Sequence, residues 1–150
     1  MSAKQKINRV EPLIRIRKLQ LDHEAATLFQ IKQEKNAAQR QLHENQRLYI
    51  EGVNQLNLVR QSNARAQQSV LESGLDFVKS KWYKSLKAFR EIENKERAQL
   101  AMVLLARKNL KTMDTLKDRY VEQDNAAEKA SERKQMDDVA IRMFNQDQSE

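Results

Sequence analysis

The chain has 150 residues and little material for turns, because it contains two glycines, one proline and no cysteine. Aromatic residues make up 5% and charged residues 33%, which excludes a β-sandwich or barrel and favours long helices. The net charge of +7 favours acidic partners, and the absence of cysteine excludes disulfides, thiol catalysis and cysteine-rich zinc sites.

The first predicted helix spans about residues 12–60. Pro12 suits the first turn of a helix, where its missing amide hydrogen has no partner in any case, so we expect the helix to begin near it. Apolar side chains then recur at the heptad spacing of a coiled coil, with one lysine among them. This stripe consists of Ile14, Leu21, Leu28, Lys35, Leu42, Tyr49 and Leu56. A companion stripe drifts, which predicts local unwinding of the seam; it comprises Ala25, Ile31, Ala38, Val53 and Val59.

Residues 61–74 are predicted to reverse the chain. Small and polar residues dominate this segment, and Val70 and Leu71 are its large apolar side chains. We expect Ser73 or Asp76 to cap the following helix by accepting a backbone hydrogen bond in its first turn.

The second predicted helix spans about residues 75–144, and the polar tail 145–150 is expected to fray. Its seam has one stripe of Leu75, Trp82, Phe89, Glu96, Val103 and Leu110 and another of Val78, Ile92, Ala106, Met113, Tyr120 and Ala127. The predicted fold is all-α, a long antiparallel two-helix coiled-coil hairpin forming one domain over residues 1–150. The seam leaves pairing within one chain and pairing between two chains both open.

Neither a secretion signal nor a membrane span is predicted. Charged residues interrupt the N-terminal segment between Glu11 and Lys18, where a secretion signal has an apolar core. The longest apolar run, Leu100 to Ala106, has seven residues, whereas a span needs about 20. We therefore expect a cytoplasmic protein that does not insert into a membrane.

The sequence has no pattern typical of an enzyme. His23 and His43 are its two histidines, and the acidic neighbours of His23 point to other faces of the helix, so no metal site is predicted. The two glycines are too far apart for a phosphate-binding loop, and a two-helix fold lacks the concave pocket that shifts the pKa of a catalytic group. We expect neither catalysis nor a cofactor.

Basic and aromatic residues alternate between positions 79 and 90, where Trp82 and Phe89 lie seven residues apart. Core packing with lysines beside the seam explains this pattern, and a protein-binding surface or a nucleic-acid-binding surface explains it as well. Tyr83 lies off the seam and is the aromatic side chain best placed to contact a partner.

Residues near the end of the chain carry a family resemblance. Lys134-Gln135-Met136-Asp137-Asp138-Val139-Ala140-Ile141-Arg142 resembles the closing signature of the flagellar FliJ family, approximately Lys-x-(Leu/Met)-Asp-(Glu/Asp)-x-Ala-x-Arg. The Leu-Ile-Arg-x-Arg-Lys pattern at residues 13–18 and Leu116-Lys117-Asp118-Arg119 are also similar to the family.

The resemblance implies a non-catalytic stalk and adaptor of the flagellar type III protein-export apparatus. Its partners would be the hexameric export ATPase, the cytoplasmic domain of the export gate and export chaperones, and it would associate peripherally with the export apparatus at the inner membrane. The basic residues near the two ends of the chain that we expect to dock into the ATPase are Arg15, Arg17, Lys18, Arg133, Lys134 and Arg142. The nearest matches to gate-contact residues are Leu42, Tyr49, Trp82, Leu86 and Phe89.

An antiparallel hairpin brings both termini to one end, so Arg9, Arg15, Arg17 and Lys18 are expected to face Arg133, Lys134 and Arg142. That end would then be strongly basic.

Three alternative functions stay open. The chain is also compatible with the equivalent stalk of a virulence injectisome, with a nucleic-acid-binding rod and with a purely structural coiled coil. Nucleic acid is the least expected partner, and it would show binding that weakens steeply with salt.

Overall fold

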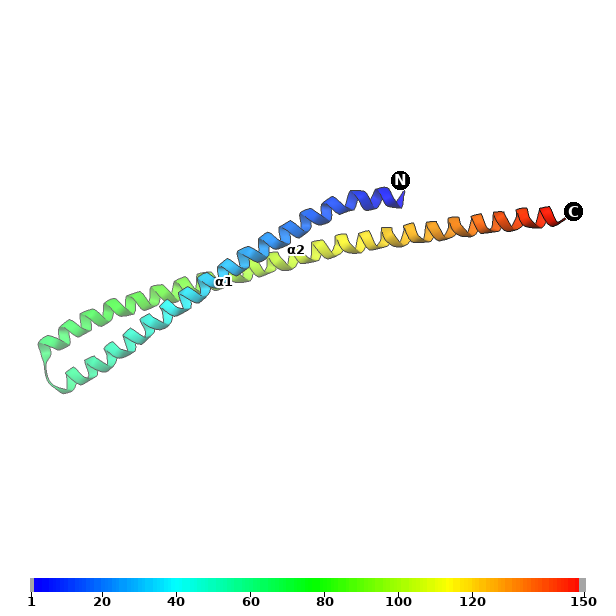
Figure 1. Ribbon diagram of the computed structural model, residues 1–150. Helices are drawn as coiled ribbons and strands as arrows, with labels where there is room; N and C mark the ends of the chain where they lie inside the picture. Colours follow the sequence, from blue (N-terminus) through cyan, green and yellow to red (C-terminus); the bar gives the residue numbers. More distant parts are fainter. Residues whose placement is uncertain (1, 149–150) are drawn as a thin grey trace. The chain divides into compact units, whose positions relative to one another are not determined.

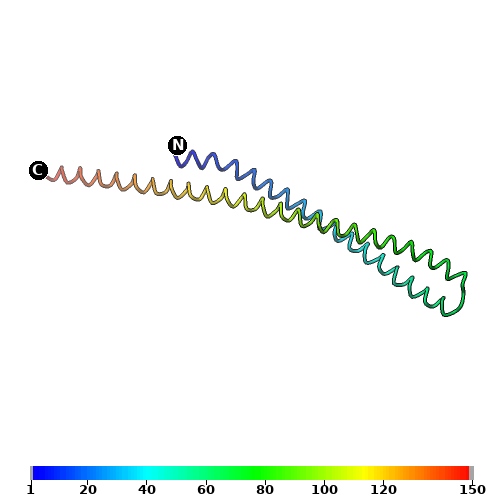
Figure 2. The backbone as a smooth tube through the Cα atoms, turned by 180° about the vertical axis from the view of Figure 1, so that it is seen from behind, coloured from blue at the N-terminus to red at the C-terminus, as the bar shows by residue number. Residues whose placement is uncertain are grey.

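The computed structural model describes residues 2–148, and it contains two helices. Helix α1 spans Ala3–Gln61 and helix α2 spans Arg65–Gln148, and both views show them running in opposite directions side by side (Figures 1 and 2). The described part of the chain has no strand. The predicted all-α, antiparallel two-helix fold is confirmed.

Contacts divide the chain into two compact units. The first unit joins residues up to Asp22 with residues from Leu105 onward, and the second unit is His23–Leu104. In each unit a segment of α1 packs against a segment of α2.

The seam of α1 is regular along the whole helix. The predicted stripe from Ile14 to Leu56 is buried or half-buried at every position. The companion stripe also repeats every seven residues without drift, as Val10, Arg17, Glu24, Ile31, Ala38, Asn45, Gly52 and Val59. The predicted drift is wrong because polar residues and a glycine occupy half of these positions, so an apolar pattern alone cannot trace them.

Helix α1 begins earlier than predicted, at Ala3. The Ser2 hydroxyl accepts a hydrogen bond from the Gln5 amide at 3.3 Å, and the Gln5 side chain accepts one from the Ser2 amide at 3.1 Å. This reciprocal pair is a capping box. Pro12 therefore lies inside the helix, at an exposed position where water can hydrogen-bond the carbonyl that its missing amide leaves unpaired.

The chain reverses over residues 62–64, a much shorter segment than predicted. Asn63 adopts the left-handed conformation, with φ of 59°, which asparagine tolerates better than most residues. The Ser62 amide donates to the carbonyls of Leu58 and Val59 at 3.2 and 3.1 Å, and this closes the last turn of α1.

The segment predicted as the rest of the reversal is the first part of α2. Gln68, Leu71 and Leu75 are half-buried there, so the seam continues through the polar stretch, and Arg60 pairs with Glu72 across the turn at 3.3 Å. Ser73 and Asp76 lie inside the helix and do not cap it.

The other end of α2 extends to Gln148, so residues 145–148 of the predicted polar tail are helical. The last two residues of the predicted tail lie outside the described residues. No helix between residues 2 and 148 has the length and apolar character needed to cross a bilayer.

Two glycine substitutions test the helix interior. No atom lies within 4 Å of a Cβ built on Gly74, whereas a Cβ on Gly52 would lie 2.8 Å from Cδ1 of Leu75. Gly74→Ala should therefore stabilise the protein by about 1 kcal/mol through helix propensity. Gly52→Ala should gain less, because Leu75 must shift. Urea unfolding followed by circular dichroism measures both changes, and an unchanged or lower midpoint for Gly74→Ala would contradict this account.

The turn should also respond to pH. Hydrogen bonds from Gln68 and from Arg60 lower the pKa of Glu72 below its ordinary value of 4.5. A lowered pKa means that these bonds stabilise the fold at neutral pH and are lost as the pH falls through the folded-state pKa. Glu72→Gln should thus lower the melting temperature at about pH 7, and this effect should disappear as the pH falls through the lowered pKa of Glu72. A difference that persists in acid would show that the carboxylate is not its source.

Candidate functional site

In the first unit, α1 packs along α2 only as far as Glu128. Glu11 pairs with Lys117 at 3.4 Å, the Lys6 ammonium lies 5.4 Å from the centre of the Tyr120 ring, and Lys4 pairs with Glu128 at 3.8 Å. Helix α2 continues past the start of α1 (Figures 1 and 2), and every residue from 125 to 148 is exposed. We call residues 129–148 the C-terminal overhang; it is about 30 Å long at 1.5 Å per residue.

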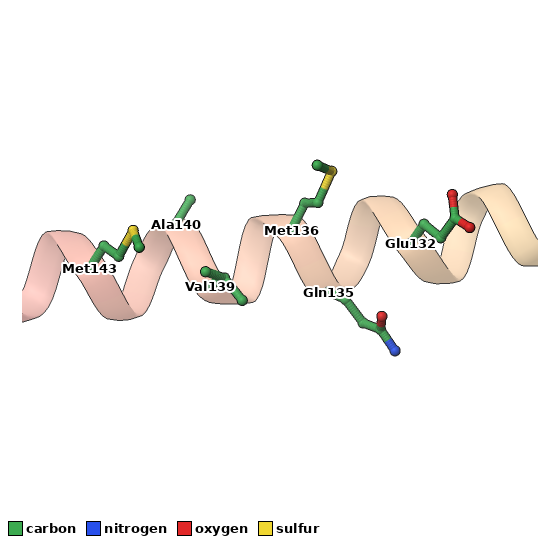
Figure 3. A pocket seen from close by; sticks show the side chains of 6 residues that line it. All are labelled: Glu132, Gln135, Met136, Val139, Ala140 and Met143. Atoms are coloured by element: carbon green, nitrogen blue, oxygen red, sulfur yellow. The ribbon is translucent and has the colours of Figure 1, made fainter.

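One face of the overhang is apolar. Met136, Val139, Ala140 and Met143 recur at the three- and four-residue spacing of one helix face, and they line a shallow pocket with Glu132 and Gln135 (Figure 3). Met136 is 73% exposed and Met143 62% exposed. Large apolar side chains exposed in a contiguous group mark interaction sites.

The overhang is not basic, contrary to expectation. Its four basic side chains are Lys129, Arg133, Lys134 and Arg142, and they are balanced by four acidic ones, Glu132, Asp137, Asp138 and Asp147. An apolar face on a helix of zero net charge suits a protein partner better than it suits nucleic acid, for which a basic surface is required.

The predicted ATPase-docking residues form two separate groups. Arg15 and Lys18 are exposed and Arg17 is half-buried on the part of α1 that packs against α2. Arg133, Lys134 and Arg142 lie on the overhang, beyond the Lys4–Glu128 pair. About 25 to 40 Å along the helix axis separates the two groups at 1.5 Å per residue. The expectation that they face one another is wrong, because α2 extends past the first residues of α1.

The five predicted gate-contact residues all lie in the second unit. Leu42, Tyr49, Trp82, Leu86 and Phe89 are all half-buried on the facing sides of α1 and α2, and we call them the aromatic seam cluster. The rings of Tyr49 and Trp82 stack across the two helices with centroids 5.2 Å apart. These side chains therefore hold the helices together and leave part of their surface exposed.

Two aromatic rings beside the aromatic seam cluster are more exposed. Tyr83, predicted to lie off the seam, is 53% exposed and stacks on Trp82 at 5.7 Å. Phe77 is exposed as well, with the Lys81 ammonium 4.7 Å from its ring centre. The sequence prediction missed Phe77, although its four-residue spacing from Lys81 places both on one helix face.

Ion pairs cover the neighbouring surface of α1. Arg47 donates to Glu44 and, at 2.6 Å, to Glu51. The hydrogen bond from Arg47 lowers the pKa of the Glu44 carboxyl, and the same bond raises the pKa of the Arg47 guanidinium. His23 and His43 are exposed, and residues 2–148 contain no group of three metal-ligating side chains close enough to share one ion.

The sequence of the chain matches a known protein family. The family model described as flagellar FliJ protein matches residues 5–149, nearly the whole chain. The chain belongs to the flagellar FliJ family. Membership makes it a protein of the flagellar export system, and the segment that resembles the closing signature of the family is the apolar face of the overhang with its flanking charges. No curated protein and no solved structure matches the chain significantly.

The overhang itself was not predicted from the sequence. The predicted arms of about 12–60 and 75–144 differ in length, but the seam pattern alone does not tell which residues of the longer arm lack a partner helix. Met143 and Phe144 are exposed because, in the observed pairing, the first residues of α1 lie beside Glu128 and reach no farther along α2.

The aromatic stack can be tested through Trp82, which is the single tryptophan of the chain. Tyr49→Ala removes a half-buried ring and leaves Trp82 without the ring that stacks on it from α1. The variant should therefore be less stable by about 2 kcal/mol, and the emission of Trp82 should shift to longer wavelength because the indole is more exposed to water. Tyr83→Ala is the matched control, with an expected cost below about 1 kcal/mol because that ring is largely exposed. Equal costs for the two variants in urea unfolding would contradict the structural role of Tyr49.

Proposed function

We propose that this FliJ-family protein is a non-catalytic central stalk and adaptor of the flagellar export apparatus, and that it docks into the hexameric export ATPase through the C-terminal overhang. The observation that carries the proposal is the apolar face of Met136, Val139, Ala140 and Met143 on a helix segment that α1 does not cover. Family membership supports the flagellar system over the injectisome alternative.

The overhang has the properties that a stalk inside a ring requires. One helix is about 10 Å wide, so it fits a narrow axial opening. Its apolar face is a short stripe and its net charge is zero, so it can contact successive ring subunits without a strong electrostatic preference for one of them. Binding that favours the assembled, active arrangement of the ring over other arrangements would raise ATPase activity by differential affinity.

The basic side chains have a secondary place in this proposal. Arg133, Lys134 and Arg142 flank the apolar face and would contact the inner surface of the ring. Arg15, Arg17 and Lys18 lie farther back on α1 and would contact the ring only near its entrance, because the overhang separates them from its tip.

The second unit supplies the surface for the other partners in our proposal. The exposed edges of the aromatic seam cluster, together with Tyr83, would contact the cytoplasmic domain of the export gate. Export chaperones would bind the same adaptor. The protein would act in the cytoplasm, associated peripherally with the export apparatus at the inner membrane and without membrane insertion.

The decisive experiment measures the ATPase activity of the purified hexameric flagellar export ATPase while this protein is titrated. The triple variant Met136→Ser, Val139→Ser, Met143→Ser should need at least about 1,000-fold more protein for half-maximal stimulation, since three buried side chains at roughly 1.5–3 kcal/mol each contribute at least about 4.5 kcal/mol. The control triple variant Phe29→Ser, Leu58→Ser, Val70→Ser removes equally exposed apolar groups elsewhere and should stimulate normally. Full stimulation by the overhang variant would exclude the overhang as the docking element.

A further inference from the structure

The seam of the second unit contains three polar layers, which neither the family match nor the proposed function explains. Asn45 is only 5% exposed, and its side-chain amide donates to the Ser85 hydroxyl. Lys35 donates to Glu96 at 3.3 Å, and both of these side chains are at least two-thirds buried. Gln99 donates to the Glu24 carboxylate and, at 2.9 Å, to the Glu24 backbone carbonyl.

Each layer pairs one polar group of α1 with one of α2. The Ser85 hydroxyl that accepts from Asn45 donates in turn to the Lys81 carbonyl at 3.0 Å, so this layer forms a complete chain of hydrogen bonds. No buried side-chain nitrogen or oxygen among residues 2–148 lacks a hydrogen-bond partner. The polar layers are therefore satisfied in the observed register.

These layers restrict the register, that is, which residue of α1 lies opposite which residue of α2. The apolar seam alone does not fix the register, because it is compatible with sliding by one heptad. Sliding α2 by seven residues in either direction would place Asn45 opposite Val78 or Ile92 and Lys35 opposite Phe89 or Val103. Glu24 would then face Ile92 or Ala106. All of these positions lie on the seam, so both slips keep the helices in contact but leave every polar layer without its partner.

Parallel pairing between two copies is disfavoured by the same residues. In a parallel, in-register pair of α1 helices each seam residue faces its own copy. Lys35 would face a second Lys35 and Glu24 a second Glu24, which places like charges together in a partly buried seam.

We infer that the Asn45–Ser85, Lys35–Glu96 and Glu24–Gln99 layers determine the pairing of this protein: they select one antiparallel register of α1 against α2 and exclude both heptad slips and parallel dimers. An apolar residue at these positions would pack in several registers, whereas a polar residue is satisfied in one. The layers thus make the seam less stable than an apolar one would be, but they allow a single register.

The test uses distance measurements between two spin labels. The chain has no cysteine, so Gln33→Cys and Ser80→Cys place labels at two exposed positions, one on each helix of the second unit. In the observed register the labelled positions lie about 25 Å apart along the helix axis, and a heptad slip changes that separation by about 10 Å.

The main variant makes all three layers apolar by Glu24→Leu, Lys35→Leu, Asn45→Leu, Ser85→Ala, Glu96→Leu and Gln99→Leu. The labelled parent protein should give one distance. The apolar variant should have a higher melting temperature together with a second distance, displaced by about 10 Å along the axis, or a dimer mass. A control variant with Gln39→Leu, Gln41→Leu and Lys87→Leu adds apolar groups at exposed positions and should keep the single distance.

A charge exchange gives an independent readout in a variant of unchanged composition. Lys35→Glu alone places two carboxylates in one layer and should lower the melting temperature, and adding Glu96→Lys should restore both the melting temperature and the single distance. Two results would overturn the inference: an apolar variant with the same single distance and mass as the parent, or an exchanged pair that does not restore the parent's behaviour.

Discussion

Pairing of the two heptad seams is the constraint on which this structure depends. A seam between two helices is one side chain deep, and no large side chain among the described residues is fully buried. Stability must therefore come from many half-buried contacts spread along the helices. Wherever α1 lies against α2 these contacts accumulate, and where α1 is absent, as beyond Glu128, the apolar side chains of α2 remain exposed.

The apolar part of this pairing could be predicted from the sequence, and the polar part could not. The stripe from Ile14 to Leu56 and both stripes of α2 as far as Tyr120 lie on the seam as predicted. The companion stripe of α1 cannot be recognised from apolar residues alone, because Asn45 is polar and is buried only through its hydrogen bond to Ser85 on α2. The turn was predicted too long for a related reason: Gly74 and its polar neighbours weaken the pattern, although Gln68, Leu71 and Leu75 keep the helix on the seam.

The candidate sites differ in the same way. Positions on the predicted stripes are expected to be covered by the other helix, and Leu42, Tyr49, Trp82 and Phe89 are half-buried there, with Tyr49 stacked on Trp82. The basic residues near the two termini carry no such pattern. Their relative positions depend on where the turn lies and on how far each helix extends, so the separation of Arg15 from Arg133 required the structure.

The shallow seam also has a consequence for divergence among proteins of this architecture. Most side chains off the seam touch no neighbour across it, so their replacement changes the folding free energy little. Selection for folding then acts on a minority of positions, spaced three and four apart, together with the few groups that contact partners. Homologous chains can therefore exchange most of their surface while they keep the same pair of helices, provided that they retain the seam spacing and the few groups that contact partners.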